Sequence, residues 1–426
     1  MSLVSSNRAL EVEQRIESAL SRLEGVNTEF EPVPIWIDQP LHTVYIPADR
    51  LPDTVIDDWR DAAWDAARQA GGIDAIARAI DVDPADTRAL VIRVSEKLHA
   101  QPIEDLRIDF EDGYGYRSDA EEDAEADRAG VISAAVRSRA GAPSRIGLRI
   151  KPLDRRGAAR GVRTLRRYLR SFLDAAGTDS DVSALRITLA KVMHGTQVTV
   201  LDEVCRALEV EHGLGAGSLG IELQVEVPHI IGGVSPETAL IELAAHPRVR
   251  ALHFGTYDYT SAQGILPSDQ RSTHPVSRHA TRIMQVAAAS NGIEACDGSL
   301  NRLPTGTVEQ QLSAWSAHAD MVRDGLKSGL PQGWDLHPAQ LITRYLAGFG
   351  VLQAEVPDAR RRLRLAAGLD ALSGSGAGIL DEPATLRMLG AVLARAIRRG
   401  VTTAEDLGDG LTPEMVERIA LAGRAT

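Results

Sequence analysis

The sequence reads RIGLRIKPL at 145–153, LRITLAKV at 185–192 and GIELQVEV at 220–227, three β-type runs that decide the fold. In several runs of this kind apolar residues occupy successive positions, which is typical of strands buried on both faces. Stretches with helical spacing separate them, such as TQVTVLDEVCRAL at 196–208. Strands that alternate with helices pair in parallel through crossover connections, so a parallel sheet is predicted.

The same rhythm continues on both sides of these runs. The further strand candidates are HTVYIP (42–47), LRIDFED (106–112), VRALHFGTYD (249–258), GIEACDG (292–298) and GWDLHP (333–338). Eight candidate strands within about 300 residues favour an α/β fold of the closed (β/α)8 TIM-barrel type over an open sheet. No GxGxxG motif follows the first run, which argues against a dinucleotide-binding sheet.

Two regions lie outside this rhythm. Residues 1–40 are expected to form an N-terminal helical extension with one helix over 8–23, and residues 41–345 the catalytic barrel. Residues 346–426 are expected to form a C-terminal helical segment that acts as a lid or an oligomer contact. The SGSGAG stretch at 373–378 is composed like a flexible joint.

Composition excludes several classes of protein. The 426-residue chain carries a formal net charge of −12, which argues against nucleic acid as the main partner. Its two cysteines exclude a disulfide framework and argue against a structural zinc site. No run of 18 apolar residues predicts a membrane span, and the N-terminus lacks the pattern of a signal peptide. We therefore expect a cytoplasmic protein.

Polar side chains gather at the carboxyl ends of the predicted strands. They are Asp109, Glu111, Asp112, Arg149, Lys151, Lys191, Glu226, Asp258, Asp297 and His337. A TIM barrel assembles its active site at this end. The one-sided placement therefore predicts a catalytic site rather than a surface of scattered polar groups.

A divalent metal is the first chemistry that these residues suggest. Glu226 and Asp258 come from neighbouring strands, and two carboxylates can hold Mg²⁺, or Mn²⁺ in its place, with water and substrate oxygens completing the shell. A single acid at a strand end more often accepts hydrogen bonds from nearby amides. In DFED, Asp109 and Glu111 share one strand face and Asp112 follows, and acids this close need a cation between them.

Basic residues supply the expected substrate contacts. Arg149 can clamp a carboxylate with two parallel hydrogen bonds, or form an internal ion pair with Asp109 or Glu111. Lys151 and Asp297 are further candidates for substrate binding. Lys191 could form a Schiff base, but a charge-balancing role ranks above it because Schiff-base chemistry needs no metal pair.

Two charged runs receive structural interpretations. Seven arginines lie in 155–170, and a solvated outer helix is favoured over a phosphate site. The acidic run SDAEEDAEAD at 118–127 is interpreted as a solvated helix face.

Six motifs in order resemble those of the citrate lyase beta-subunit-like, or HpcH/HpaI aldolase, family of the phosphoenolpyruvate/pyruvate superfamily. YIPADR (45–50) resembles F-V-P-G-x-R, DFEDGYG (109–115) resembles D-L-E-D-x-V, and LRIKPL (148–153) stands at the R-V-N strand. VEVPHII (225–231) stands at the I-E-T strand, FGTYDYT (254–260) resembles F-G-x-x-D, and WDLHPAQL (334–341) resembles I-H-P-x-Q. The resemblance spans roughly 42–341 and more weakly 373–392, and it implies a TIM barrel.

The resemblance also implies roles for individual residues. Glu226 and Asp258 take the places of the metal-ligating carboxylates, and Arg149 that of the arginine that holds a 2-oxoacid carboxylate. Glu111 and Asp112 take the places of the acids near the metal. ILDEP (379–383) resembles M-I-D-x-P, which would make Asp381 a catalytic base supplied by a neighbouring subunit of a homo-oligomer.

The chain also departs from the family pattern. Ile150 and Lys151 stand where an asparagine follows the arginine, and Val-Pro follows Glu226 where Thr-Ala is typical. These departures bear on which substrate the chain would bind, and in particular on whether it uses CoA. They leave the predicted metal pair unchanged.

The implied reaction is Mg²⁺-dependent cleavage or formation of a carbon–carbon bond in a 2-oxoacid of the pyruvate, oxaloacetate or glyoxylate type. A metal-stabilised enolate would form, with an acyl-CoA as a candidate partner. The base would be Asp381, or otherwise a metal-bound hydroxide or Asp112. Two alternatives stay open, namely phosphoryl or carboxyl transfer from phosphoenolpyruvate and a non-catalytic barrel that binds a 2-oxoacid.

Overall fold

The computed structural model describes residues 14–18, 20–21, 35–177, 181–369 and 381–424. The chain divides into two compact units, Met1–Val33 and Pro34–Thr426. In the first unit residues 14–18 are helical, which agrees with the helix expected over 8–23, most of which lies outside the described residues. The second unit holds every other element.

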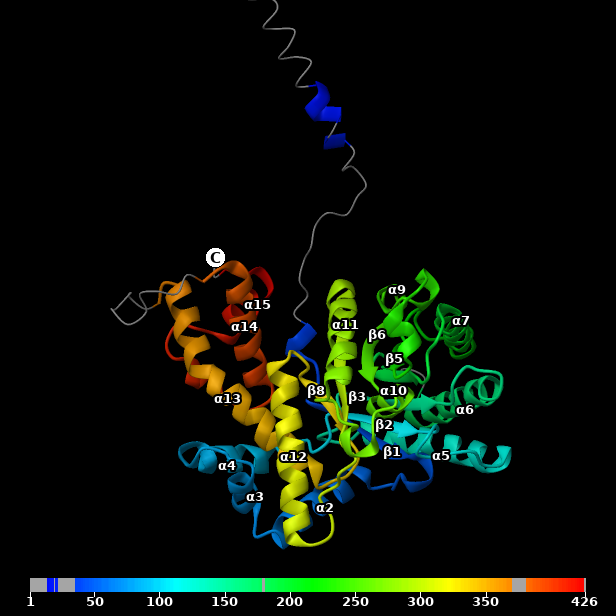
Figure 1. Cartoon of the computed structure of the whole chain (residues 1–426), viewed down its shortest axis with the longest axis horizontal. Helices are drawn as coiled ribbons and strands as arrows, with labels where there is room; N and C mark the ends of the chain where they lie inside the picture. Colours follow the sequence, from blue (N-terminus) through cyan, green and yellow to red (C-terminus); the bar gives the residue numbers. More distant parts are fainter. Residues whose placement is uncertain (1–13, 19, 22–34, 178–180, 370–380, 425–426) are drawn as a thin grey trace, which may run out of the picture. The chain divides into compact units, whose positions relative to one another are not determined.

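Eight parallel strands close into a barrel in the order of the sequence (Figure 1). They are β1 (His42–Pro47), β2 (Asp105–Asp109), β3 (Arg145–Ile150), β4 (Leu185–Leu189), β5 (Gly220–Val225), β6 (Val249–Phe254), β7 (Glu294–Ser299) and β8 (Gln332–Asp335). β1 pairs with both β2 and β8, which closes the ring. The predicted (β/α)8 TIM barrel is confirmed.

Several predicted runs extend past the carboxyl end of the actual strand. β2 ends at Asp109 rather than at 112, and β6 ends at Phe254. Residues beyond these ends stay buried, as Phe110 does, so the apolar pattern continues after strand pairing has stopped. As a result, Asp258 lies in the first turn of α10 (Thr256–Ala262) and not on a strand.

Helices surround the barrel and cover its apolar outer face. The connection after β1 carries α2 (Val55–Gln69), α3 (Ile73–Ala79) and α4 (Pro84–Ala100), and the others between strands are α5 (Asp119–Arg137), α6 (Ala158–Ala176), α7 (Gly195–His212), α8 (Pro228–Gly232), α9 (Leu240–Ala244), α10, α11 (Pro275–Asn291) and α12 (Val308–Lys327). On α2 the residues Val55, Trp59 and Ala63, spaced four apart, form a buried stripe. No helix among the described residues is long and apolar enough to cross a membrane.

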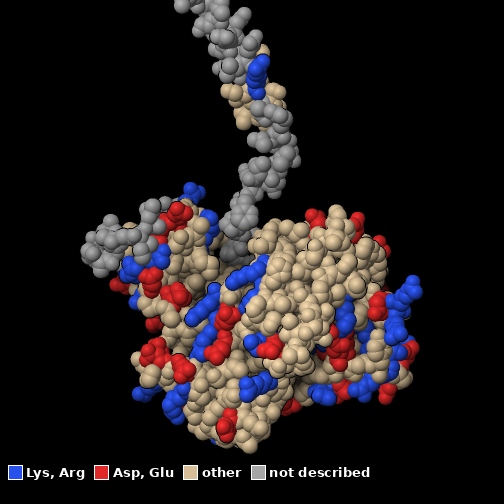
Figure 2. All heavy atoms as spheres, viewed as in Figure 1, with Lys and Arg blue, Asp and Glu red and all other residues tan. Residues whose placement is uncertain are grey.

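The acidic and basic runs pair with each other along α5 and α6. Arg160 and Arg163 on α6 both contact Asp119 on α5, and Arg163 and Arg167 both contact Asp123. Blue and red side chains alternate along this edge of the molecule (Figure 2). The solvated faces expected from the sequence are therefore an interhelical ladder of ion pairs.

The inside of the barrel is polar. Arg107 is fully buried and bonds Asp105 and Glu222, each at 2.9 Å from Nη2. Although burial disfavours the charged carboxylate, Arg107 and His253 lower the pKa of Glu222 to about 2. A buried charge of this kind is tolerated because it is paired and hydrogen-bonded.

The C-terminal segment packs against the amino end of the barrel. α13 (Gln340–Ala366) runs through the expected boundary at 345/346, and α14 (Pro383–Arg398) and α15 (Pro413–Ala422) follow it (Figure 1). Arg395 on α14 donates to the carbonyls of Trp36 and Pro40, which precede β1. The expected joint at 373–378 lies outside the described residues.

Candidate active site

Lys191 stands at the centre of an acidic cluster at the carboxyl end of the barrel. Its Nζ lies 2.7 Å from Glu111 Oε1, 2.8 Å from Asp112 Oδ2 and 3.3 Å from Asp258 Oδ2. Its backbone amide donates to Glu226 Oε1 at 2.6 Å. Four acids from three separate parts of the sequence therefore meet around Lys191, three at its ammonium group and one at its backbone amide. We call Glu111, Asp112, Glu226 and Asp258 the acid cluster.

The backbone at Lys191 is unusual. Its φ of 51° lies in the left-handed region, which non-glycine residues seldom adopt and which costs of the order of 1–3 kcal/mol. This conformation turns the Lys191 amide toward Glu226. Although burial opposes the charged form, Glu226 and the other carboxylates raise the pKa of Lys191. A raised pKa is unsuited to a Schiff-base lysine, which must lose its proton to act as a nucleophile.

Glu226 is the most deeply buried acid of the cluster, with 2% of its surface exposed. Its second oxygen accepts a hydrogen bond from the Gln224 amide at 2.6 Å. Burial, assisted by Asp258 and Glu111 and opposed by Lys191, raises the pKa of Glu226 to about 8. The Glu226 carboxyl group is therefore fixed by hydrogen bonds in surroundings that disfavour its charged form.

Arg149 on β3 forms an internal ion pair with Asp109, one of the two arrangements that the sequence allows. Its Nε and Nη2 donate to the two Asp109 oxygens at 2.7 and 2.6 Å. Its Nη1 reaches Gln224 at 3.3 Å and Glu111 at 3.5 Å. The guanidinium therefore borders the acid cluster, with Nη1 as its least firmly bonded donor.

Two aromatic rings, which sequence reasoning missed, support Arg149. The Tyr45 and Trp334 rings stack 4.3 Å apart, and the guanidinium carbon lies 5.3 Å from the Tyr45 centroid and 6.0 Å from that of Trp334. Rings at this range attract a cation. Both residues lie within predicted strands, Tyr45 in β1 and Trp334 in β8, but only the closed ring brings the two strands together.

The acid cluster fits a hard divalent cation. Its four carboxylates face one ammonium, and Asp109 neutralises Arg149, so the site has an excess of negative charge. Carboxylate oxygens are the ligands that Mg²⁺ prefers, and it commonly takes only one or two from the protein. Among the described residues no group of three or more His, Cys, Asp or Glu is arranged to hold a metal ion. An ion here would therefore depend on few protein ligands.

Lys151 lies away from the cluster, contrary to the expected role in substrate binding. It is 1% exposed, and its Nζ bonds the Phe110 carbonyl at 2.7 Å, the Gly115 carbonyl at 3.0 Å and Glu122 on α5 at 2.9 Å. An ammonium has three N–H donors, and all three have partners here. Lys151 therefore fastens β3 to the connection between β2 and α5.

Asp297 also points away from the barrel mouth. It is buried, and its Oδ2 accepts from Arg278 on α11 at 3.2 Å, while its neighbour Cys296 packs with Tyr45 and Trp334. Adjacent residues of a strand face opposite sides. Since Cys296 faces the Tyr45–Trp334 pair, Asp297 faces the surrounding helices, and the expected substrate contact is corrected.

Asp381 does not reach the cluster within its own chain. Arg362 on α13 holds both of its oxygens, with Nε at 3.1 and 3.2 Å. Arg362 lies 18 residues beyond Arg344, which bonds Asp335 on β8, and a helix rises about 27 Å over that distance. Asp381 is therefore fixed to α13 of its own chain, and the role of the C-terminal segment as a lid or an oligomer contact stays a prediction.

Comparison with known proteins agrees with this architecture. The family model described as "Domain of unknown function (DUF6986)" matches residues 35–422. No curated protein matches the chain in sequence. A citrate lyase from Burkholderia xenovorans LB400 has a TM-score of 0.56 at 21% identity, over 88% of this chain and 98% of its own. The malate synthase of Haloferax volcanii, in a lead(II) complex, has a TM-score of 0.50 at 15% identity, over 83% and 80%. These neighbours confirm the predicted resemblance at the level of the fold.

Proposed function

Because the chain belongs to the family described as a domain of unknown function (DUF6986) and shares its barrel with a citrate lyase, we propose that it is a Mg²⁺-dependent carbon–carbon lyase that acts on a 2-oxoacid. The observation that carries this proposal is the acid cluster next to Arg149. The acid cluster offers negative charge for a metal cation, and the neighbouring Arg149 offers positive charge for the substrate carboxylate.

Glu226 and Asp258 are the acids that would hold the ion, with Mn²⁺ as an alternative to Mg²⁺. Glu226 directly follows β5, and Asp258 lies in the first turn of α10, which follows the adjacent strand β6. Asp258 is half exposed and accessible to solvent. When bound, the ion supplies Lewis-acid stabilisation of the negative charge that develops on the 2-oxoacid. Arg149 Nη1 would bind the substrate carboxylate, because the other side of the guanidinium is fixed by Asp109.

The proton transfer falls to an acid at the mouth of the barrel. Asp112 has 59% of its side chain exposed, and although burial opposes the charge, Lys191 keeps its pKa below the usual value. As a carboxylate it would take the proton of the substrate hydroxyl while the carbon–carbon bond breaks. The electron pair then stays with the 2-oxoacid fragment, which finally gains a proton at carbon.

Asp381 remains a candidate base only if a second copy of the chain supplies it. Co-expression of Asp381→Asn with Glu226→Gln tests this role, because mixed oligomers would contain some sites with both intact residues. Restored activity supports an active site that two chains share. If mixed oligomers are shown to form and activity is not restored, the base belongs to the same chain as the acid cluster.

Activity assays on the purified chain test the proposal. We expect cleavage of a 4-hydroxy-2-oxoacid to release pyruvate, measured with lactate dehydrogenase, or condensation of glyoxylate with acetyl-CoA to release a thiol. Glu226→Gln or Asp258→Asn should abolish turnover and leave the circular dichroism spectrum unchanged. Asp320→Asn is the matched control, since its side chain is 72% exposed and pairs only with Arg323.

The assays also distinguish the alternative functions. Turnover of phosphoenolpyruvate in place of 2-oxoacids would assign phosphoryl or carboxyl transfer, although most arginines of 155–170 pair with acids of the surrounding helices and offer no phosphate site. Stabilisation by Mg²⁺ and oxalate without turnover of any substrate would indicate a binding protein. Activity unaffected by EDTA would contradict the proposed metal.

A further inference from the structure

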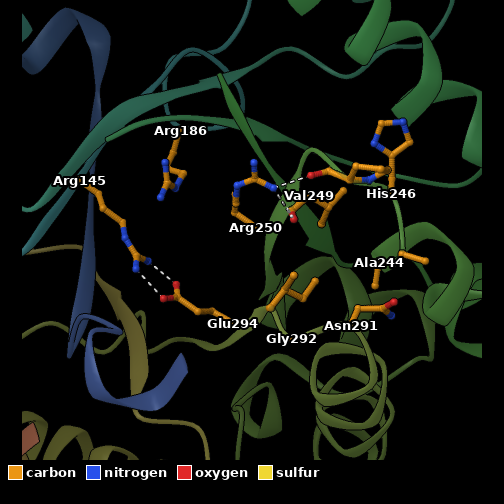
Figure 3. A pocket seen from close by; sticks show the side chains of 12 residues that line it. Arg145, Arg186, Ala244, His246, Val249, Arg250, Asn291, Gly292 and Glu294 are labelled. Carbon is orange, nitrogen blue, oxygen red and sulfur yellow. Dashed lines mark hydrogen bonds and ion pairs between the residues drawn. The ribbon is translucent and has the colours of Figure 1, made fainter. Parts of the chain in front are cut away.

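A cavity lies at the amino end of the barrel, away from the acid cluster. Its volume is about 330 Å³, within the range of small-molecule sites. It is lined by Arg145, Arg186, Ala244, Ala245, His246, Pro247, Val249, Arg250, Asn291, Gly292, Ile293 and Glu294 (Figure 3). The starts of β3, β4, β6 and β7 bring three arginines to it, and we call it the arginine pocket.

One carboxylate lines the arginine pocket, and it is already engaged. Glu294 bonds Arg145 with both oxygens, and the Nη2–Oε1 distance is 2.5 Å (Figure 3). A bidentate pair of this kind satisfies the charge of both partners. Among the described residues Glu294 therefore forms no ion pair with Arg186 or Arg250, and it attracts Arg186 only over a longer range.

Among the described residues no carboxylate forms an ion pair with Arg186 or Arg250. Arg186 Nη1 donates only to the carbonyls of Ser183 and Leu185, and Arg250 Nη1 to those of Pro247 and Val249. The buried Nε of Arg186 has no hydrogen-bond partner in the described part of the chain. Backbone carbonyls accept hydrogen bonds but do not cancel a full positive charge. In the described part of the chain Arg186 is therefore attracted by Glu222 and Glu294 only over a longer range, without a directly bonded carboxylate.

The two guanidinium-bearing side chains converge at Gly220, the first residue of β5. A Cβ atom at this glycine would lie 3.1 Å from Arg250 Cγ and 3.2 Å from Arg186 Nη1. The glycine thus leaves room for both arginines at one point, and Figure 3 draws them next to each other. The cations that disfavour the charged form of Arg186 are Arg145 and Arg107, and a bound anion would offset that repulsion.

The charge of the arginine pocket contrasts with that of the whole chain. Three arginines and one glutamate face a cavity in a protein whose formal net charge is −12. Burial, together with the neighbouring Arg145, lowers the pKa of Arg186 below its ordinary value. A partly closed cavity lined by several arginines suits an anion, because a bound anion offsets the repulsion between the positive charges.

We propose that the arginine pocket binds a small organic phosphate, with the phosphate group held between Arg186 and Arg250. Guanidinium groups donate in a fork that matches phosphate oxygens, and two forks suit a dianion. The cavity extends past the arginines to Ala244, Pro247 and Ile293, so the rest of the ligand has an apolar wall. The Asn291 amide and His246 offer polar contacts along the same wall. This site is independent of the proposed lyase chemistry.

Calorimetric titration of the full chain with inorganic phosphate and phenyl phosphate, in EDTA and at constant ionic strength, tests the proposal. We expect one saturable site, with phenyl phosphate the tighter ligand because its ring meets the apolar wall. Arg186→Gln and Arg250→Gln should each weaken binding roughly tenfold or more, since each removes charge-assisted hydrogen bonds. Arg166→Gln is the matched control, because Arg166 is 64% exposed and pairs with Glu211 on the outer helices.

Each other outcome has a definite meaning. No saturable binding of either probe, or undiminished binding by the Arg186→Gln/Arg250→Gln double variant, overturns the proposal. If malonate binds as tightly as phosphate, the proposed phosphate ligand is wrong and the site is assigned to a dicarboxylate. If a duplex oligonucleotide binds more tightly through the same arginines, the proposed small-molecule ligand is wrong and the site is assigned to nucleic acid. Arg186→Lys, which retains the charge, shows whether a loss in Arg186→Gln comes from misfolding.

Discussion

Replacing Gly255 by alanine should displace Glu226 without straining the backbone. Gly255 has φ of −94°, which alanine adopts freely, but its new Cβ would lie 2.4 Å from Glu226 Cβ and 2.6 Å from Oε2. Carbon atoms in contact prefer at least about 3.5 Å, so Glu226 must move by about 1 Å. Overpacking of this kind costs about 1–3 kcal/mol of unfolding free energy, and a 1 Å misplacement at a site can lower the rate about a hundredfold.

Three measurements check this prediction. Denaturant unfolding should give the loss of stability, Mg²⁺-dependent thermal stabilisation the loss of metal affinity, and kcat/KM the loss of turnover. Gly350→Ala is the matched control. Its Cβ meets only Leu90 at 3.8 Å inside α13, where alanine should stabilise by about 0.5–1 kcal/mol. A Gly255→Ala enzyme with unchanged Mg²⁺ affinity and turnover would show that the position of Glu226 does not matter to the reaction.

Four further predictions follow from the charges. EDTA should abolish turnover but hardly change Tm, because Lys191 balances part of the acid cluster without a metal; a large fall in Tm would make the ion structural. The pKa of Glu222 is lowered from 4.5 to about 2 in the folded chain, so the stabilisation it gives is present above pH 4.5 and is lost as the pH falls toward 2. As the pH falls through that window, the free energy of unfolding should decrease more steeply for the wild type than for Glu222→Gln. Equal slopes of unfolding free energy against pH would refute the lowered pKa of Glu222. Arg163→Gln should hardly change the free energy of unfolding, since Arg163 is half exposed and its ion pairs are screened by solvent. Asp335→Asn should cost about 3–5 kcal/mol, because Asp335 is buried among His42, His318 and Arg344; chemical denaturation compares the two variants. Borohydride with pyruvate should leave Lys191 unlabelled in mass spectrometry, and a reduced adduct there would restore the Schiff-base mechanism.

The barrel could be predicted from the sequence because the alternation of strands and helices is clear along the chain even where the ends of single strands are not. All eight strands occur where the runs predict them, and β1 has the predicted bounds. The carboxyl ends were less predictable, since burial continues after pairing stops. Asp258 was assigned to a strand because FGTYD continues the apolar pattern, although Thr256 already begins a helix.

The members of the site were predicted more accurately than the directions of their side chains. Glu111, Asp112, Glu226 and Asp258 were all named from their positions at strand ends, and the structure brings them together around Lys191. Lys151 and Asp297 have the same kind of position but face the helices, as the sequence does not fix which face of a strand turns inward. That choice depends on closure of the ring, which no local pattern contains.

The place of Lys191 explains how the acid cluster can fold before any ion arrives. Four acids gathered at one end of the barrel would repel each other strongly if no cation stood among them. Even with Lys191 beside it, burial keeps the pKa of Glu226 raised to about 8. Lys191 supplies that cation from β4, at the price of a left-handed backbone. One ammonium cannot neutralise four acids, however, so the cluster keeps its attraction for a further cation. Lys191 thus offsets part of the repulsion within the acid cluster and leaves a net negative charge, which is the balance that the proposed site for a reversibly bound divalent ion requires.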